Sequence, residues 1–239
     1  MSAASGNGAI AANRSDRRKA RTRQSLVDAA VRLIATGCGE RASIQEITDA
    51  ADVGFGSFYN HFDSKDELFQ TASDKVLERW GQMIDAACAG LDDPAQAFAV
   101  SLRISGRLAW THPTIAHFIT GAGLDLLGAS GGPAPRALRD IHAAEAARRF
   151  AVPETEVALS AVAGGLLGLL RLQERLPRRV DERTVDTFTE ACLRLLGIGA
   201  AEAHRLAHQP LPPMPYREGS PVTARAGTST PAAPAPRGG

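Results

Sequence analysis

The chain has 239 residues, of which 44% are hydrophobic and 22% are charged, and its formal net charge is +1 at pH 7. This length and composition are typical of a globular protein with one or two domains. A charge so close to zero excludes an overall basic field, so any binding of nucleic acid must come from a local cluster of charges. The three cysteines are odd in number, lie far apart and include no CxxC pair, which fits neither a disulfide framework nor a cysteine zinc site.

The N-terminus, the longest apolar run and the cysteines indicate the compartment of the protein. The N-terminus lacks the charged and then apolar order of a secretory signal, and the longest apolar run, residues 157–170, is shorter than the ~20 residues that span a bilayer. Free cysteines fit a reducing compartment. We expect a cytoplasmic protein that contacts no membrane.

The apolar residues recur with helical spacing. Leu26, Ala30, Leu33 and Ile34 follow the i, i+4, i+7, i+8 pattern of an amphipathic helix, which Gly37 ends. Two capping-box patterns begin at Ser43 and Ser64, because each serine is followed by a glutamate three residues later. Further helix starts are expected at Pro94, Pro113, Pro133, Pro153 and Asp181. With no alternating strand pattern, the sequence predicts an all-α fold of nine to ten helices.

Two short helices, at about 43–51 and 55–62, are expected to form a helix-turn-helix, whose second helix enters the DNA major groove. The spacing of Val53, Phe58 and Phe62 predicts that they point inward, toward the first helix. The other face then presents Phe55, Gly56, Ser57, Tyr59, Asn60 and His61. Any single aromatic or histidine more often covers a small core, but a polar face on so short a helix is best explained by a partner.

A basic segment precedes this motif. In residues 14–23, six basic side chains stand against the single acid Asp16, a local balance of +5. Such a run is usually solvated surface, but next to a helix-turn-helix it suggests an arm that grips phosphates. The basic residues are Arg14, Arg17, Arg18, Lys19, Arg21 and Arg23.

The stretch SIQEITDAADVGFGSFYNHFDSKDELF resembles the N-terminal signature of the TetR family of bacterial transcriptional regulators. The resemblance covers about residues 20–80. It implies a homodimer of all-α subunits, each with a three-helix DNA-binding domain and a larger ligand-binding and dimerisation domain. It also implies that Ser43, Tyr59, His61 and Lys65 contact the DNA backbone and that Phe55, Gly56 and Ser57 face the groove. The full set of expected DNA contacts is Arg17, Arg18, Lys19, Arg21, Ser43, Phe55, Gly56, Ser57, Tyr59, Asn60, His61 and Lys65.

The sequence departs from the family pattern at two positions. Gly54 stands where the family commonly has serine or threonine, and glycine caps a helix less well by a few tenths of a kcal/mol, roughly. Phe55 stands where a polar or basic residue is common. Because a phenyl ring can contact a thymine methyl but cannot pair with guanine, we expect methyl or shape readout at this position.

The expected domains follow from these motifs. Residues 1–16 form a disordered arm that leads into the basic run, and residues 17–80 form the DNA-binding domain, with the helix-turn-helix at about 43–62. Residues 81–208 form the ligand-binding and dimerisation domain, whereas the proline-rich residues 209–239 form a disordered tail.

The larger domain is expected to hold an apolar ligand between its helices. The candidate lining residues are Phe98, Leu102, Trp110, His117 and Phe118, each of which is also a reasonable core residue. His112 and His117 have no carboxylate or cysteine at ligand spacing. We therefore expect no metal site and no cofactor.

A glycine-containing apolar helix at about 157–176 is the candidate dimer interface. Each glycine inside a helix costs ~1 kcal/mol relative to alanine, which close approach of a neighbouring helix would offset. With a second helix at 184–197, two subunits would form a four-helix bundle, although the helix could instead be buried within one subunit. The expected interface residues are Gly164, Gly165, Gly168, Leu169, Leu172, Phe188 and Leu195.

These patterns predict a ligand-responsive, sequence-specific transcriptional regulator. The leading interpretation is a repressor that a small apolar or amphipathic effector releases from an inverted-repeat operator, although ligand-enhanced binding and activation stay open. The alternatives are an architectural DNA-binding or protein-interaction module without a small ligand, and a helical-bundle enzyme. An enzyme is disfavoured because the chain lacks the paired Glu-x-x-His motifs of a di-iron bundle and any evident nucleophile with its base.

Overall fold

The structure is a computed structural model that describes residues 6–39, 41–128 and 132–212. These residues form ten α-helices and two 3₁₀ helices and contain no strand, so the predicted all-α fold is confirmed. The elements are α1 (Gly6–Ala35), α2 (Ile44–Ala50), η1 (Phe55–Asn60), α3 (Lys65–Cys88), α4 (Pro94–Gly106), α5 (Leu108–Thr111), α6 (Pro113–Ala122), η2 (Gly123–Gly128), α7 (Pro133–Ala146), α8 (Thr155–Arg175), α9 (Glu182–Leu195) and α10 (Ala200–His208).

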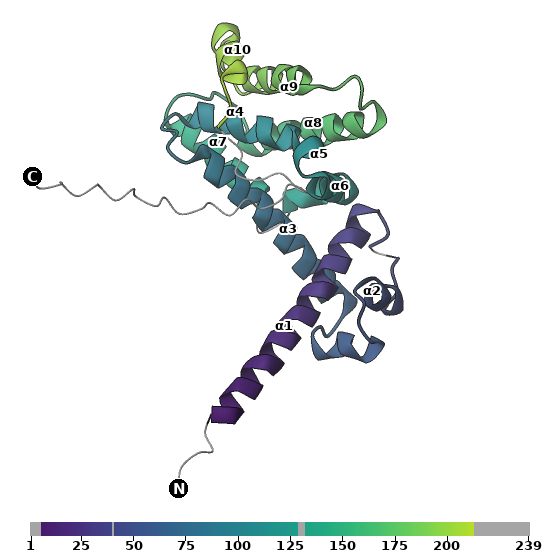
Figure 1. Cartoon of the computed structure of the whole chain (residues 1–239). Helices are drawn as coiled ribbons and strands as arrows, with labels where there is room; N and C mark the ends of the chain where they lie inside the picture. Colours follow the sequence, from purple (N-terminus) through teal and green to yellow (C-terminus); the bar gives the residue numbers. More distant parts are fainter. Residues whose placement is uncertain (1–5, 40, 129–131, 213–239) are drawn as a thin grey trace, which may run out of the picture.

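The N-terminal unit consists of α1, α2, η1 and the first turns of α3, and it lies at one end of the molecule (Figure 1). Its core is made of apolar side chains that all four elements contribute. The largest of these, Leu26, Ile47, Phe58, Phe62 and Leu68, are at most 1% exposed. Burial of these side chains holds the short elements α2 and η1, which are too short to be stable alone.

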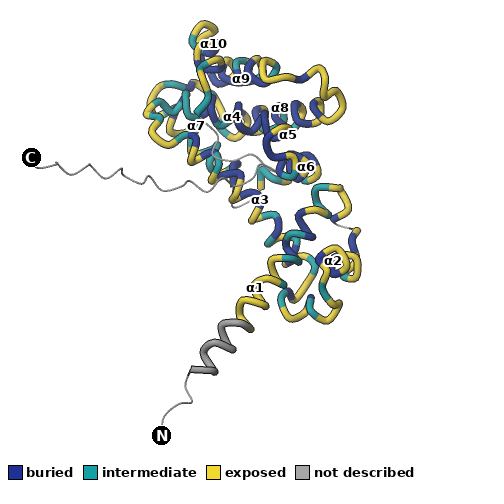
Figure 2. The backbone as a smooth tube through the Cα atoms, in the orientation of Figure 1, coloured by how far each residue is buried: buried dark blue, intermediate teal, exposed yellow. Residues whose placement is uncertain are grey.

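The long helix α3 joins this unit to the larger helical body (Figure 1). Its buried residues recur every three or four positions from Leu68 to Ala87, so a single helix contributes to both cores (Figure 2). In the larger body, the Trp80 indole N–H donates to Ser105 Oγ of α4 at 3.0 Å. Helix α3 therefore forms a continuous connection between the two units.

A buried ion cluster ties α9 to α4 in the larger body. Asp186 Oδ1 accepts hydrogen bonds from Arg103 Nε at 2.8 Å and from Arg107 Nη2 at 2.9 Å. Glu182 lies 3.6 Å from Arg107, so two carboxylates face the two guanidinium groups. Removing Asp186 would leave two buried guanidinium groups without their main partner, which makes this carboxylate a strong constraint on how α9 packs.

Both ends of the chain differ from the expectation of disorder. Helix α1 begins at Gly6, so the segment 6–16 of the expected disordered arm is helical. The alanines of this segment favour a helix, and adding residues to an existing helix is much easier than starting one. At the other end, Arg103 Nη1 donates to the Gln209 carbonyl at 2.5 Å and Leu211 packs against the core. Residues 1–5 and 213–239 of the expected arm and tail lie outside the described ranges.

Two local features of the helix-turn-helix region also differ from the prediction. The element at 55–62 is a 3₁₀ helix that ends at Asn60, and its N-cap Gly54 supplies no side-chain hydrogen bond. The Ser64 pattern is not a full capping box. Ser64 Oγ accepts from the Glu67 N–H at 3.1 Å, but the Glu67 carboxylate accepts from the N–H of Asp63 instead. The capping box at Ser43 and Glu46 is confirmed.

Helix α8 is longer than the apolar run in the sequence. In the described ranges it is the single helix whose length and hydropathy would allow it to cross a membrane. By this measure, the expectation that the apolar run is too short to span a bilayer does not hold. It packs against α4, α5, α6, α7 and α9 within the helical body. Nevertheless, only 28% of its apolar window is buried in the single chain, which leaves an apolar face to be explained.

Candidate nucleic-acid interface and ligand cavity

Helix α2 starts at a serine whose polar atoms face the surface. Ser43 Oγ accepts from the Glu46 N–H at 3.2 Å, and the Ser43 N–H donates to Glu46 Oε2 at 2.7 Å. This backbone hydrogen bond is the main cause of the lowered pKa of Glu46. Ser43 is exposed at the start of the first helix of the motif, where a helix N-terminus favours an anion.

The aromatic rings of η1 and the residues after it divide between the core and the surface. Phe58 and Phe62 are 0% and 1% exposed, whereas Phe55 and Tyr59 are 48% and 57% exposed. The predicted burial of Phe58 and Phe62 is therefore confirmed, while Val53 is half-buried against the same core. Since burial of the two phenylalanines already anchors η1, its packing does not explain the exposed rings.

The exposed face of η1 contains the polar residues that the sequence placed there. Gly56 and Asn60 are exposed, and Ser57 and His61 are half-buried. A Cβ at Gly56 would meet no atom within 4 Å, so the backbone is open to close approach by a partner. Phe58 supports the Tyr59 ring edge-on, with ring centroids 5.3 Å apart. The resulting surface combines an aromatic hydroxyl, an amide and an imidazole.

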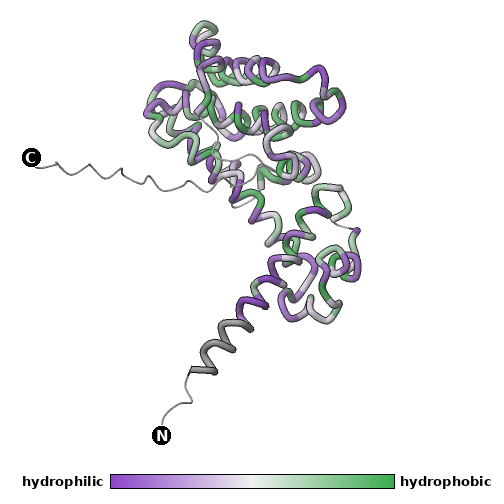
Figure 3. Tube along the Cα trace, in the orientation of Figure 1, coloured by the Kyte–Doolittle hydropathy of each residue, from purple (hydrophilic) through white to green (hydrophobic). Residues whose placement is uncertain are grey.

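The basic residues of α1 lie next to this face. Arg17, Arg18, Lys19 and Arg21 are all exposed, and hydrophilic residues follow one another along this part of α1 (Figure 3). The Arg23 guanidinium stacks over the Phe62 ring, 4.6 Å from its centroid. The predicted basic run is therefore presented on a helix. The Arg14 side chain lies outside the described part of the chain.

The electrostatic effect of α1 reaches His61. Partial burial, followed by the positive charges of Arg23 and Lys19, lowers the pKa of His61 below its ordinary value of 6.5. The imidazole is therefore neutral at neutral pH, and it can donate one hydrogen bond and accept another. Positive potential from α1 thus extends to the exposed side of the helix-turn-helix.

Lys65 has a more complex setting than the sequence suggested. It is half-buried at the first position of α3, and Asp66 and Glu67 follow it in the same turn. Together with Arg41 and Phe118, it also lines a wide hollow between the N-terminal unit and the larger body. Its position at the N-terminus of α3 suits a phosphate, but the two acids next to it reduce the local positive potential.

The larger body contains a partly open apolar cavity between its helices. The space open to the centre of a water molecule measures about 110 Å³. Phe98 and Leu102, both expected in the pocket, line this cavity. The polar residues on its wall are Ser101, Ser105, Arg136 and Asp140, and the apolar ones include Leu77, Trp80, Ile84, Ile119, Leu124, Leu126, Val162, Leu166 and Leu167.

Three of the expected pocket residues are not in this cavity. Trp110 is 41% exposed on the short helix α5, and His117 is exposed on α6. Phe118 is 1% exposed and faces the hollow next to α1 instead. The apolar pattern therefore failed at Trp110 and His117, which it did not separate from the buried face, and for Phe118 it does not show which of two neighbouring cores a buried side chain enters. For the same reason it missed Trp80 and Arg136, which reach the cavity from α3 and α7.

The expected dimer residues of α8 and α9 fall into two groups. Gly165 and Leu169 pack within the subunit: a Cβ at Gly165 would lie 2.9 Å from Phe188, and Leu169 is buried in a cluster with that ring at its edge. Both contacts lie within one subunit, as the alternative of packing inside a single chain expects. The other group lies open, because a Cβ at Gly164 or Gly168 would meet nothing within 4 Å and Leu172 and Leu195 are 43% and 53% exposed.

Family models match both parts of the chain. Residues 26–72 match the model for bacterial regulatory proteins of the tetR family, and residues 93–209 match the model for the Tetracyclin repressor-like C-terminal domain. The first range contains the helix-turn-helix, and the second contains the cavity and α8 to α10. Together the two ranges cover more than half of the chain.

Solved structures agree with this assignment. RolR without ligand is 31% identical, with 79% of this chain and 98% of RolR covered and a TM-score of 0.58. RolR in complex with resorcinol is 28% identical, with coverages of 83% and 98% and the same TM-score. NalD, the secondary repressor of the MexAB-OprM multidrug efflux pump in Pseudomonas aeruginosa, shares the fold at 20% identity, with coverages of 74% and 98% and a TM-score of 0.54.

The curated protein sequences gave no match. The two family models, the identity to RolR over nearly all of that chain, and the matching order of a helix-turn-helix unit and a helical ligand-binding domain lead to one conclusion. The chain belongs to the TetR family of bacterial transcriptional regulators.

Proposed function

We propose that this regulator is a cytoplasmic repressor that binds an inverted-repeat operator as a homodimer and is released by a small aromatic or amphipathic effector. The observation that supports DNA binding is that two of the four aromatic rings in and just after η1 are buried and the other two are exposed. Burial of Phe58 and Phe62 anchors the element, while Phe55 and Tyr59 stay about half exposed. Exposed rings beside a basic helix are suited to the DNA groove and its phosphates.

Each predicted DNA contact has a distinct part in this proposal. Ser43, Tyr59, His61 and Lys65 hold the phosphate backbone, while residues 55–57 approach the base edges and Asn60 lies beside them. The exposed phenyl ring of Phe55 reads a thymine methyl group or the shape of the groove. Arg17, Arg18, Lys19 and Arg21 on α1 add phosphate contacts, each of which steepens the salt dependence of binding by nearly one unit on a log–log plot, roughly.

The open face of α8 and α9 supports the homodimer. Gly164, Gly168 and Leu172 recur every four residues and share one side of α8, and Leu195 is exposed on α9, which packs against α8. A second copy of the same face would cover it and would allow the two helix pairs to approach closely. Two recognition elements would then stand about 34 Å apart, one turn of DNA. A dimer also accounts for the low burial of α8 without a membrane.

The cavity supports a small effector. Its wall is mainly apolar, with a few polar groups from Ser101, Ser105, Arg136 and Asp140 that could orient a hydroxyl. RolR, which has the higher identity among the structures described above, was solved with resorcinol. A small hydroxylated aromatic compound is therefore our proposed effector class. A larger body without a cavity would have favoured the alternative of a DNA-binding module that has no small ligand. We propose no enzymatic activity.

The cavity has two physical connections to the DNA-binding unit. Leu77 and Trp80 of α3 line it, and the same helix begins at Lys65 in the N-terminal unit. A second connection runs through α6, where a Cβ at Gly121 would lie 3.0 Å from the Ile34 carbonyl of α1. Ligand binding that favours one arrangement of these helices would shift the spacing of the recognition elements, with a coupling free energy of about 1–3 kcal/mol.

Selection of bound duplexes from a random pool, followed by footprinting, tests the proposal. We expect an inverted repeat with half-sites one turn apart, and release of the protein when resorcinol is added. The Leu102→Trp variant fills the cavity and should keep DNA binding while losing the response to resorcinol. Selection of a site without symmetry would contradict the dimer, and a response that Leu102→Trp leaves unchanged would contradict the proposed cavity.

Operator binding should strengthen as the pH falls. A phosphate beside His61 favours the imidazolium form, so its pKa should rise in the complex from the lowered value in the free protein. DNA binding then takes up protons. Between the pKa of His61 in the free protein and its pKa in the complex, operator affinity should increase by up to roughly tenfold for each subunit as the pH falls by one unit. Anisotropy titrations across this range should show the slope in the wild type and in His142→Gln, and a flat profile in His61→Gln. A slope of the opposite sign would refute the contact.

A further inference from the structure

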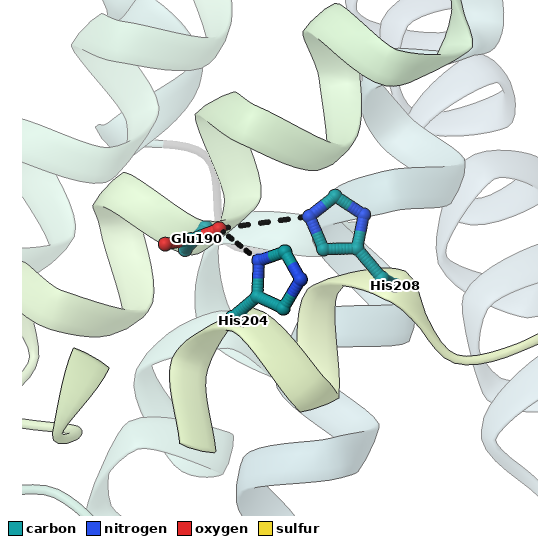
Figure 4. A group of neighbouring side chains, drawn as sticks. All are labelled: Glu190, His204 and His208. Atoms are coloured by element: carbon teal, nitrogen blue, oxygen red, sulfur yellow. Dashed lines mark hydrogen bonds and ion pairs between the residues drawn. The ribbon is translucent and has the colours of Figure 1, made fainter. Parts of the chain in front are cut away.

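Three side chains with metal-binding atoms meet on the outer surface of the larger body, away from the cavity. His204 and His208 lie one turn apart on α10, and Glu190 faces them from α9 (Figure 4). Glu190 Oε2 lies 2.9 Å from His204 Nδ1 and 3.5 Å from His208 Nε2. One ligand atom from each residue lies within 4.8 Å of the other two.

Two of the three ligand separations suit a small metal ion, and the third, between the two histidine nitrogens, is no more than 4.8 Å. Zinc binds imidazole nitrogen and carboxylate oxygen at about 2.0–2.2 Å, so neighbouring ligand atoms around a tetrahedral ion stand roughly 3.3 Å apart. The measured separations of 2.9 and 3.5 Å lie on either side of that spacing.

A second carboxylate stands behind one of the histidines. Asp186 Oδ2 lies 4.0 Å from His208 Nδ1, on the other side of the ring from Glu190. Asp186 itself is held by Arg103 and Arg107, which both donate to its other oxygen, Oδ1. A carboxylate behind a metal-bound histidine fixes its tautomer and ring orientation. Asp186 therefore lies on the Nδ1 side of His208, and Nε2 faces Glu190.

We propose that Glu190, His204 and His208 form a site for a divalent transition-metal ion of the zinc class, which links α10 to α9. Water completes the coordination, because His204 is 66% exposed at its side chain. The two nitrogen ligands favour zinc, nickel or copper over magnesium and calcium, which prefer oxygen. This proposal replaces our sequence-based expectation that the chain has no metal site, and it does not depend on DNA or effector binding.

The position of the site indicates what the ion would stabilise. Helix α10 is nine residues long and is already held through Glu202, whose carboxylate pairs with Arg149 at its N-terminal end. The proposed ion would hold its C-terminal end, just before Gln209. Because a metal bound only by the folded chain stabilises it by mass action, zinc should raise the thermal stability of the protein.

Calorimetric titration of the untagged full chain with zinc tests the site. We expect one zinc ion per chain, with Co²⁺ giving the visible bands of a site of low coordination number. His204→Gln and His208→Gln should each weaken zinc binding at least about tenfold, since loss of an outer-sphere partner alone costs about 10–100-fold. The matched control is His142→Gln, which removes an exposed histidine that pairs with Glu145 but has no second histidine beside it.

Zinc should also raise the melting temperature of the wild type and of His142→Gln, but not that of the two ligand variants. Circular dichroism of the metal-free proteins shows whether each variant folds. If a histidine variant does not fold, Glu190→Gln replaces it in the test. The proposal is wrong if the wild type shows no saturable zinc binding. It is equally wrong if affinity and melting shift survive when both histidines are replaced, because zinc would then bind elsewhere.

Discussion

Replacing Phe58 with alanine is expected to lower the free energy of unfolding by about 3–5 kcal/mol, as is typical for a fully buried phenylalanine. Phe58 is 0% exposed and contacts the rings of Tyr59 and Phe62. Because η1 is only six residues long, it has little stability apart from this packing. Urea denaturation followed by circular dichroism measures the loss, and DNA binding should disappear with it.

The control for this prediction is Phe55→Ala. Phe55 belongs to the same 3₁₀ helix but is 48% exposed, so its replacement should change the free energy of unfolding by no more than about 0.5 kcal/mol. Equal losses in the two variants would mean that the two rings are not divided between the core and the surface.

The double variant Leu172→Glu and Leu195→Glu is expected to turn the dimer into a monomer. Both leucines are exposed in the single chain, and charges there would be buried without partners in the four-helix interface. A monomer reaches only one half-site, so affinity for the two-half-site operator should fall by about 10²–10⁴, the gain that linked binding provides. Sedimentation analysis and operator titration measure the two effects.

Ala86→Glu provides the matched control, because it adds one charge to an exposed position of α3 outside the proposed interface. It should leave both the oligomeric state and operator affinity unchanged. If the double leucine variant remained a folded dimer of normal affinity, the α8 and α9 face would not be the interface.

The sequence predicts the DNA-binding unit well, because its information is local. Capping at Ser43 and the spacing of Phe58 and Phe62 determine which face of each short helix is buried. The failure at Ser64 is also local: the backbone turns so that Glu67 reaches the Asp63 N–H in place of that of Ser64. No sequence pattern distinguishes these two partners, which are adjacent in the chain.

The larger body is less predictable, because its sites join distant segments. Phe98 and Leu102 were found since α4 is apolar on most sides, but the cavity also needs Trp80 and Arg136, which helix packing brings in. The proposed metal site has the same origin. The spacing of His204 and His208 on one helix face was visible in the sequence, but Glu190 joins them only through the packing of α10 on α9.

The measurement that tests the central claim most directly is operator affinity of Tyr59→Ala beside its thermal stability. Tyr59 is 57% exposed, so the variant should melt close to the wild-type temperature. A lost hydrogen bond to a charged phosphate is worth about 1.5–3 kcal/mol, so affinity should fall at least about tenfold. Unchanged affinity in a folded Tyr59→Ala protein would contradict the claim that the exposed face of η1 binds DNA.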